Sequence, residues 1–376
     1  MSTPRTVLVI GGGAAGNAAT ILLRRAGIPV DLIEAKEDWN ATAGSGITLQ
    51  GNALRVLREL GVWDEVEKSG YGFDAVGITA PDGTVLHVSE DLRTGGDELP
   101  ATVGMQRPQL QRILIDAVRA SGATVRLGVR AASFEQSADG VTVTFDDGTT
   151  GHYALVIAAD GMGSATRAAI GITDRPEPTG MAIWRVATPR PATLTRTDLA
   201  YGGPAYIAGY CPTSEDTIYA YVVEDKRDRA SIPADSYADE MRRLASAYGG
   251  HWPEITRHIT DPARVNYTWF DRMLVEGSWH RGRVVLVGDA AHCCPPTLAQ
   301  GAALSMEDAW VLTRMLTASD TWDDGLFQAY YERRIARVRP VVEASVQIGQ
   351  WQLDGVRDAD LPGLMGRTMT MLRELP

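Results

Sequence analysis

The first residues that could do chemistry are glycines near the start of the chain. The run Gly11-Gly12-Gly13-Ala14-Ala15-Gly16 has the GxGxxG spacing and directly follows the apolar, strand-like run Val7 to Ile10. In such a turn the first glycine permits the bend, the next admits a pyrophosphate, and the last lets the following helix pack closely on the strand. The helix N-terminus adds partial positive charge. We expect this turn to bind a dinucleotide through Gly11, Gly13, Ala14, Ala15 and Gly16.

A carboxylate follows the next predicted strand, at Glu34, eighteen positions after Gly16. At this distance it can accept hydrogen bonds from both hydroxyls of an adenosine ribose. The alternative is a glycine-rich turn beside a solvated glutamate. The fingerprint alone does not choose between NAD and FAD.

Two further runs combine glycine with charged residues. One is Asp160-Gly161-Met162-Gly163-Ser164-Ala165-Thr166-Arg167, and the other is Gly288-Asp289-Ala290-Ala291-His292, which continues through Pro295-Pro296 and Ala299-Gln300-Gly301 to Glu307-Asp308-Ala309. Arg107 precedes a proline and a helical pattern. Singly, an Asp-Gly pair is commonly a turn and an arginine before proline is commonly solvated. Their joint order and spacing make the pattern specific.

Together these motifs resemble those of the flavoprotein aromatic hydroxylases of the para-hydroxybenzoate and salicylate hydroxylase type, from residue 6 to about residue 340. The resemblance implies FAD as cofactor and NADH or NADPH as a transient cosubstrate. It also implies that O₂ is used, through a flavin C4a-hydroperoxide, to hydroxylate a small aromatic or heteroaromatic molecule. A flavin-dependent reductase or a non-enzymatic FAD-binding sensor would share every cofactor motif.

The resemblance assigns cofactor contacts to several separate segments. Asp289, with Gly288 before it, matches an aspartate that meets the ribityl chain, and Arg107 matches an arginine near the phosphates. A helix N-terminus along the pyrimidine edge would stabilise reduced flavin. The other residues that match cofactor-contact positions are Asp160, Arg167, Gly46 and Ile47 of the loop Gly44 to Ile47, Pro296, Gln300, Gly301 and Ala302. Two positions depart from the pattern: Ala35 replaces an arginine, so that Lys36 or nothing serves there, and Ala299 replaces a glycine.

The catalytic base is not identified by the motifs. His292 matches a position that is ordinarily structural, and the hydroxyl of Thr48 is a poor base. The remaining candidates are Tyr219 and Arg185, where Arg185 pairs either with a substrate carboxylate or with a surface carboxylate. The aromatic residues of the same region form either a substrate wall or core: Trp184, Tyr206, Tyr210, Tyr219 and Tyr221. Alternation in a strand places Tyr219 and Tyr221 on one face.

The periodicity predicts an α/β fold. A Rossmann-like FAD-binding domain with a parallel sheet is interleaved with a mixed or antiparallel substrate sheet, and a helical segment ends the chain. The expected boundaries are residues 1–70, 104–172 and 271–340 for the FAD-binding domain, 71–103 and 173–270 for the substrate domain, and 341–376 for the C-terminal helical segment. A helix is expected from Asn52 to Leu60, with Asn52 as its cap.

Composition narrows the function classes. The 376 residues carry a formal charge of −11, which disfavours a nucleic-acid partner because binding a polyanion needs clustered Lys and Arg. Three cysteines make neither a disulfide framework nor a zinc site, and we expect no metal. No apolar run is long enough for a spanning helix and no signal peptide is visible. We expect a cytoplasmic monomer or homodimer that is not an integral membrane protein.

Overall fold

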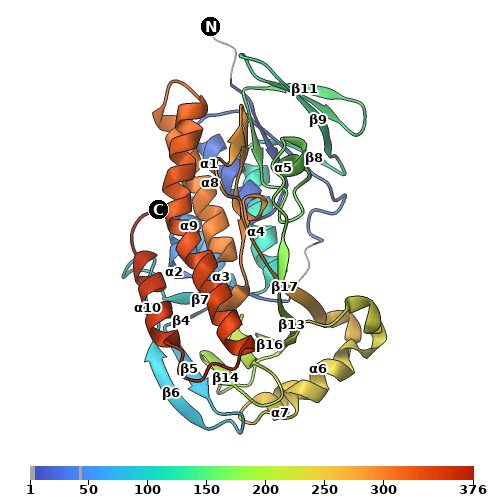
Figure 1. The fold of residues 1–376 in the computed structure, drawn as a ribbon, viewed down its shortest axis with the longest axis vertical. Helices are drawn as coiled ribbons and strands as arrows, with labels where there is room; N and C mark the ends of the chain where they lie inside the picture. The colour runs from blue at the N-terminus through green and yellow to red at the C-terminus, as the bar shows by residue number, and fades with distance from the viewer. Residues whose placement is uncertain (1–4, 42–44) are drawn as a thin grey trace.

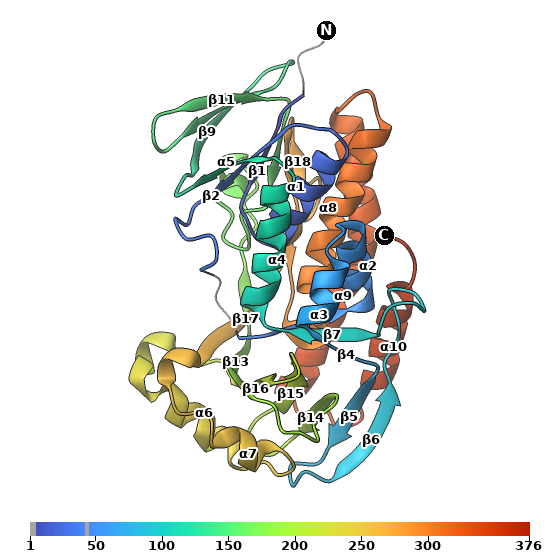
Figure 2. The ribbon, with the colours of Figure 1, turned by 180° about the vertical axis from the view of Figure 1, so that it is seen from behind.

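The computed structural model describes residues 5–41 and 45–376, so Gly44, predicted near the flavin, lies outside the described residues. Within these ranges the strands form four sheets. Figure 1 shows the helices of one part of the molecule stacked beside a sheet, with the largest sheet at the other end, and Figure 2 shows the same arrangement from behind. The predicted α/β fold class is confirmed.

A six-stranded sheet carries the glycine turn. Its order is β18-β19-β12-β1-β2-β8, and all neighbours are parallel except β18 and β19. The strands are β1 (Val7–Ile10), β2 (Val30–Glu34), β8 (Thr124–Leu127), β12 (Leu155–Ala158), β18 (His280–Arg281) and β19 (Val284–Leu286). The central strands are continuous apolar runs because both faces of a parallel sheet are covered.

Alternate residues of β1 face two different layers. Val7 and Val9 pack against helices, whereas Leu8 and Ile10 pack against a three-stranded sheet. The helical layer contains α1 (Ala14–Arg25), α4 (Arg107–Ala120), α8 (Gly301–Ala318) and α9 (Asp324–Leu353). The opposite layer contains β9 (Ala131–Gln136), β10 (Val141–Phe145) and β11 (Thr150–Tyr153), and the short helix α5 (Ala165–Ala169) lies beside β9.

An eight-stranded sheet forms the other half of the molecule. Its order is β20-β17-β13-β16-β15-β14-β5-β6, antiparallel except between β14 and β5. The strands are β5 (Ala75–Thr79), β6 (Val85–Glu90), β13 (Glu177–Pro189), β14 (Thr197–Tyr201), β15 (Ile207–Pro212), β16 (Thr217–Asp225), β17 (Asn266–Leu274) and β20 (His292–Cys293). One face is covered by α6 (Tyr237–Ala245) and α7 (Trp252–Thr256). Short 3-10 turns flank this layer: η1 (Arg229–Ser231), η2 (Ala234–Ser236) and η3 (Pro262–Arg264).

A small fourth sheet connects the two halves. Its strands are β3 (Ile47–Gln50), β7 (Thr102–Met105) and β4 (Tyr71–Phe73), followed or preceded by α2 (Gly51–Glu59) and α3 (Trp63–Ser69). Gly104 of β7 lies against β15, so close that a Cβ atom would overlap the carbonyl oxygen of Pro212 and approach the Cys211 Sγ to 2.6 Å. A glycine is needed there because the two sheets meet backbone to backbone.

The helix predicted from Asn52 to Leu60 is present as α2, shifted by one residue, but the predicted cap is wrong, because the Asn52 side chain is bonded elsewhere. The predicted break at residue 341 lies inside α9, which runs continuously through Pro340. A separate helix, α10 (Leu361–Met371), follows. The division into domains otherwise stays a prediction.

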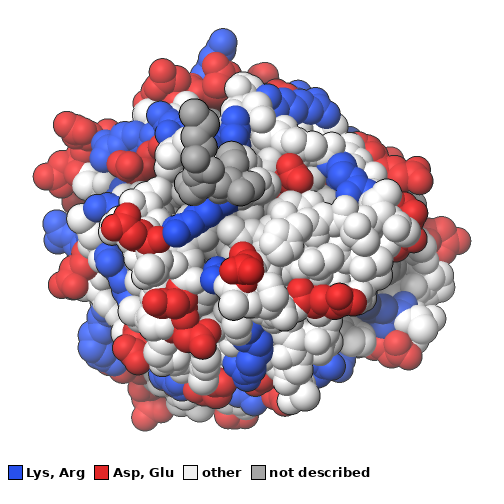
Figure 3. Space-filling view, turned by 90° about the horizontal axis from the view of Figure 1, so that it is seen from above, with Lys and Arg blue, Asp and Glu red and all other residues white. Residues whose placement is uncertain are grey.

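The surface mixes both signs of charge. On the face drawn in Figure 3, basic and acidic side chains are interspersed. Among the helices of residues 5–41 and 45–376, none combines the length and the apolar character that crossing a membrane requires.

We predict that Gly104→Ala lowers the free energy of unfolding by about 1–3 kcal/mol, because the added methyl group overlaps backbone that cannot move away easily. Gly72→Ala on β4 is the matched control, since its Cβ would lie 3.5 Å from the Pro100 side chain, an ordinary contact. Urea unfolding of both variants measures the difference. Equal stabilities would contradict the proposed tightness of the contact between the sheets.

Candidate functional site

The glycine turn between β1 and α1 requires glycine at three of its positions, and at Gly12 a Cβ would lie 2.1 Å from Nε1 of the buried Trp39 ring. Gly11 has a φ of +104°, and a Cβ there would overlap the carbonyl oxygen of Ala159. A Cβ on Gly16 would overlap the carbonyl oxygen of Gly11. Gly13, in contrast, faces open space with no atom within 4 Å of its Cβ position. The turn therefore leaves its approach open at Gly13, where a pyrophosphate was predicted.

Three side chains hydrogen-bond to the backbone of the glycine turn. The carbonyl oxygen of Gly12 accepts hydrogen bonds from Asn17 Nδ2 at 2.9 Å, Trp39 Nε1 at 2.9 Å and Gln111 Nε2 at 2.7 Å. No side chain caps the N-terminus of α1. Its first N–H groups therefore have only the ligand or water to bind, which suits an anion.

Glu34 also braces the turn. Its Oε2 accepts from Gly12 N at 2.8 Å and its Oε1 accepts from Lys36 N at 2.9 Å. Each carboxylate oxygen can accept a further hydrogen bond, so the predicted ribose contact is compatible with this geometry. Ala35 is exposed, and Lys36 Nζ donates to the carbonyl oxygen of Ala41 at 2.5 Å.

The Asp160 loop is organised by its own hydrogen bonds. Asp160 accepts from Ser164 Oγ at 2.6 Å and from Thr166 N at 3.0 Å. Arg167 is only 1% exposed and donates to the carbonyl oxygens of Ala290 at 3.0 Å and Met162 at 3.0 Å. We correct its predicted role accordingly: Arg167 positions the Gly288 to Ala290 turn and is too enclosed to bind the cofactor directly.

The Gly288-Asp289 turn, η4 (Gly288–Ala290), lies between α1 and α8. Gly288 has a φ of +59°, and a Cβ there would lie 2.8 Å from Ser305 Oγ and 3.1 Å from Ala15 Cβ. Asp289 has accessible surface, yet burial raises the pKa of its carboxyl, and nearby His292 and Arg107 oppose the rise. The carboxyl is thus accessible although protein atoms surround it, and we interpret this position as the side of a cleft.

Arg107 lies across the same cleft. Its side chain also has accessible surface, and burial lowers the pKa of its guanidinium while the charge of Asp289 raises it. Arg185, a second cation, lowers the pKa of Arg107 further. Arg107 and Asp289 were predicted from different motifs, and the fold brings them together.

The predicted pyrimidine-edge loop ends in an unusual backbone conformation. The 3-10 turn η5 (Pro296–Leu298) is followed by Ala299 with a φ of +52°, the one non-glycine residue with positive φ in residues 5–41 and 45–376. The helix α8 then begins at Gly301 without a side-chain cap, and Gly301 faces open space. Its free N–H groups can stabilise the negative charge of a reduced flavin. Pro296 is exposed and Ala302 partly exposed beside them.

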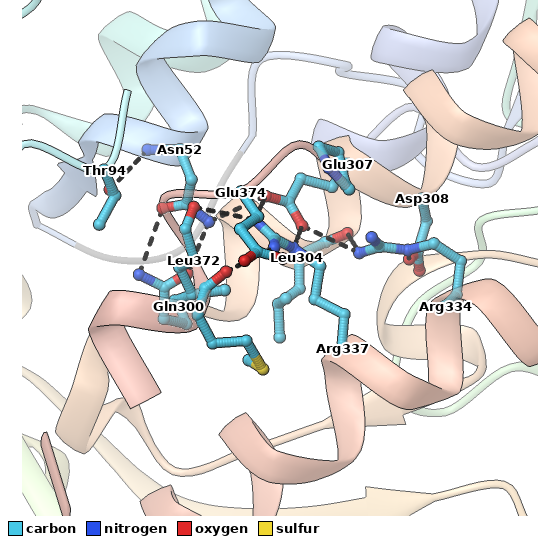
Figure 4. Close-up of polar contacts among 12 residues, drawn as sticks. Asn52, Thr94, Gln300, Leu304, Glu307, Asp308, Arg334, Arg337, Leu372 and Glu374 are labelled. Carbon is cyan, nitrogen blue, oxygen red and sulfur yellow. Dashed lines mark hydrogen bonds and ion pairs between the residues drawn. The ribbon is translucent and has the colours of Figure 1, made fainter. Parts of the chain in front are cut away.

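The Gln300 side chain points into the protein. It is 0% exposed, and its Oε1 accepts from Asn52 Nδ2 at 2.9 Å. Asn52 Nδ2 also donates to Glu307 Oε1 at 3.1 Å, and Arg337 binds both oxygens of Glu307 at 2.8 Å (Figure 4). Gln300 can therefore meet a cofactor only through its backbone, which corrects the prediction for its side chain.

A second ion pair lies next to this one. Arg334 Nε donates to Asp308 Oδ1 at 2.6 Å, while Asp308 Oδ2 lies 2.7 Å from His292 Nε2 and accepts from Gly288 N at 2.8 Å. Burial alone would raise the pKa of Asp308, but His292 and Arg334 hold it below its usual value. His292 is 2% exposed. These buried contacts favour the structural role implied by the matching position over a place for His292 among the catalytic candidates.

The aromatic residues divide between the two faces of the eight-stranded sheet. Trp184 and Tyr210 belong to the core under α6 and α7, so for these two residues the core alternative holds and not the substrate wall. Tyr219 and Tyr221 share the opposite face, with ring centroids 5.1 Å apart. Gly46 lies so close to Tyr219 that a Cβ would overlap the ring. Burial raises the pKa of Tyr219, against the effect of Arg185 and Arg107.

Arg185 therefore joins the cleft from the neighbouring strand. It is paired in register with Tyr221 and donates to Thr268 Oγ1 at 2.8 Å. Cys211, on β15, completes this face. It is 1% exposed, and burial raises the pKa of its thiol to about 11, so it is not a nucleophile at neutral pH.

Sequence reasoning missed the residues that support the site. Trp39 and Gln111 hold the glycine turn, and Asn52, Arg334 and Arg337 hold the loop before α8. The spacing of Arg334 and Arg337 on one helix face was visible, but a pair of arginines three apart is usually solvated. The partners are about 25 to 30 positions away, so only the fold identifies them.

These residues fit a flavin dinucleotide. The site has two uncapped helix N-termini, at α1 and α8, and a charged cleft with Arg107 and Asp289 between them. Together these features match the pyrophosphate, ribityl and ring portions of the dinucleotide. In residues 5–41 and 45–376 no group of three or more His, Cys, Asp or Glu side chains could hold a metal ion.

Comparison with known proteins agrees with this fit. Residues 5–345 match the family described as FAD binding domain. The chain is 32% identical to the putative FAD-dependent monooxygenase YetM of Bacillus subtilis over 98% of this chain and 99% of YetM. It is 31% identical to 2-heptyl-3-hydroxy-4(1H)-quinolone synthase of Pseudomonas aeruginosa, over 92% and 90%. The crystal structure of Klebsiella pneumoniae HpxO complexed with FAD and uric acid superposes with a TM-score of 0.83 at 25% identity, covering 98% and 92%.

We predict that Gly13→Ala and Gly16→Ala separate ligand binding from folding. The Gly13 methyl enters open space, so Tm should change by less than about 2 °C while FAD dissociates more readily. The Gly16 methyl overlaps backbone and should cost about 1–3 kcal/mol in the apoprotein. Thermal unfolding of both apoproteins and FAD titration distinguish them. A Gly13→Ala variant with unchanged FAD affinity would contradict the pyrophosphate assignment.

We predict that Ala299→Gly stabilises the protein by up to about 1 kcal/mol, because glycine adopts a positive φ without the cost that a Cβ imposes. Ala302→Gly, three positions on inside α8, is the control and should destabilise by about 1 kcal/mol. Urea unfolding of the FAD-loaded proteins measures both. A loss of stability in Ala299→Gly would show that the left-handed conformation is not a source of strain.

Proposed function

The chain belongs to the FAD-binding-domain family of flavoprotein monooxygenases, and we propose that it hydroxylates a small aromatic or heteroaromatic molecule. The observation that carries this proposal is the position of Tyr219. It lies where the predicted cofactor elements, through Gly46 and Arg107, meet the sheet face that holds Arg185 and Tyr221. A flat ring would be held there between the cofactor and an aromatic surface.

The proposed reaction uses the cosubstrates of the family, and its atoms and electrons balance. An acceptor R–H, O₂, NAD(P)H and H⁺ give R–OH, NAD(P)⁺ and water, so one oxygen atom enters the ring and the other is reduced. When bound, FAD would supply the redox chemistry that hydride uptake and oxygen activation require. The residues of this chain bind and orient the acceptor and keep water away from the reacting atoms.

The charges in the cleft favour an acidic acceptor. Arg107 and Arg185 lie close enough for the charge of one to lower the pKa of the other, so an anion between them would be stabilised. A phenolate is also the more reactive form of a phenol in this chemistry. Tyr219 stays protonated because its pKa is raised, and it can donate a hydrogen bond to such an oxygen.

The names of the relatives point to the same class of acceptor. They include a hydroxyquinolone synthase, a 3-amino-4-hydroxybenzoate 2-monooxygenase of Streptomyces platensis and a structure with bound uric acid. The molecules in these names are aromatic or heteroaromatic rings with acidic protons. The choice between NADH and NADPH, the cytoplasmic location and the monomeric or homodimeric state stay predictions.

We predict that phenols, hydroxybenzoates and hydroxylated N-heterocycles include compounds that accelerate NAD(P)H oxidation by the FAD-loaded protein and appear as hydroxylated products. Oxygen uptake, peroxide release and product are measured together. Within the responsive class, Arg185→Met should raise the KM about 10-fold or more for an acceptor with a carboxylate and much less for its neutral analogue.

The control is Arg196→Met, because Arg196 is bonded to Asp198 on β14 and is not among the residues placed in the cleft. Flavin reduction without an oxygenated product from any compound would contradict the monooxygenase proposal. Equal KM changes for acid and neutral analogues would contradict the proposed role of Arg185 but not the monooxygenase proposal.

A further inference from the structure

A second cavity lies where the eight-stranded sheet meets the C-terminal helices. Its volume is about 710 Å³, within the range of small-molecule sites. Its walls come from the turn between β14 and β15, the end of α9 and the start of α10, which lie together at the lower end of Figure 1. Its apolar lining comes from Tyr201, Tyr206, Ile348, Trp351, Val356 and Leu361, and charged side chains, Glu224, Asp225 and Arg357, also line it.

This cavity and the Tyr219 cleft share one face of the sheet. Tyr201 pairs in register with Ile207, Gly209 with Tyr221, and Cys211 with Tyr219. Successive alternate residues of β15, from Cys211 through Gly209 to Ile207, therefore lead from the cleft to the cavity. This path is about 14 Å long, because each residue of a strand advances about 3.4 Å.

The space between them is shaped by a tyrosine. A Cβ on Gly209 would lie 2.7 Å from the Tyr221 hydroxyl and 2.9 Å from Leu199 Cδ2, so the tip of the Tyr221 ring lies over the glycine. Tyr221 and Tyr201 have accessible surface although burial raises the pKa of both, and the two side chains are close enough for Tyr201 to raise the pKa of Tyr221. Tyr201 therefore lies close to Tyr221 and also lines the second cavity.

One polar group of the cavity has no partner. Both Gln352 Nε2 and Gln352 Oε1 are buried without a hydrogen bond to the described residues. The carboxylates of the cavity are already engaged, since Asp225 accepts from Tyr206 OH at 2.6 Å and Glu224 accepts from Trp184 Nε1 at 2.6 Å. A buried amide is costly to leave unpaired. Gln352 therefore offers one neutral donor and one neutral acceptor to a ligand.

We propose that this cavity is a second subsite for the acceptor molecule. It takes an apolar extension of the ring that is hydroxylated, and Gln352 pairs with an amide or hydroxyl group carried by that extension. A single ring at Tyr219 cannot span about 14 Å, so the acceptor is an elongated molecule with an aromatic head and a tail. The inference rests on the proposed function and specifies its substrate class.

The test compares three probes: 4(1H)-quinolone, its 2-heptyl derivative, and a derivative with a chain of equal length that ends in a carboxamide. Binding to the FAD-loaded protein is followed by calorimetry, and hydroxylated product is measured separately. Wild-type protein should bind both tailed probes about 10-fold or more tightly than the bare ring, because several methylene groups are buried.

Two variants locate the effect. Ala359→Trp fills the cavity and should bring the ratio of tailed to bare affinities close to one, whereas Asp358→Trp, its neighbour outside the lining, should not. Gln352→Leu should weaken the carboxamide probe about 10-fold relative to the heptyl probe. Gln350→Leu, on the exposed side of the same helix, is its control.

The outcomes separate the two proposals. Equal or undetectable binding of the three probes by the wild type, or a tail effect that survives Ala359→Trp, overturns the subsite. Product formation without a tail effect leaves the monooxygenase proposal standing alone. A tail effect that depends on residues 352 and 359, without product from any acceptor, supports the subsite and removes the monooxygenase proposal.

Discussion

Two buried carboxylates of α8 hold the candidate site together. Glu307 accepts hydrogen bonds from Arg337 of α9, and Asp308 accepts one from Arg334 of the same helix. Removing one partner of such a pair is expected to cost about 3–5 kcal/mol, because the other charge stays buried. The same two carboxylates reach, through Asn52 and Gly288, the two loops predicted to contact the flavin. Their geometry therefore depends on α9.

The end of the chain belongs to this arrangement as well. Arg337 donates to the carbonyl oxygens of Met371 and Leu372 at 3.1 and 3.0 Å, and Arg55 donates to that of Glu374 at 3.1 Å. Backbone carbonyl groups at the end of α10 and beyond it thus bind Arg55 of α2 and Arg337, and the contacts of Arg337 with Glu307 support the flavin-edge loop. This connection couples the C-terminal helices, which line the proposed second subsite, to the position of α8.

One part of the cleft is positively charged and the other is aromatic and neutral. Helix N-termini at α1 and α8 and the cations Arg107 and Arg185 make it positive, which suits phosphates, reduced flavin and an acidic acceptor. Asp289 is the carboxylate placed among them, and burial raises its pKa. On the acceptor side the surface becomes aromatic and neutral, because Tyr219 and Tyr221 stay protonated. The cleft is thus lined by charged groups where the cofactor is expected and by aromatic groups where the substrate is expected.

The sequence by itself determined the elements and the cofactor motifs. Glycine spacing, apolar runs and the Asp-Gly pairs are local properties, and β1 has the bounds expected from its apolar run, Val7 to Ile10. Only the tertiary structure decided which polar residues face the cleft. The side chains of His292, Arg167 and Gln300 point into the protein because they hydrogen-bond to buried partners elsewhere in the chain. Trp184 and Tyr219 lie on opposite faces of the sheet, because strand alternation shows which residues share a face but not which face meets the cleft. Partners of this kind are set by the packing of whole elements, which no local pattern records.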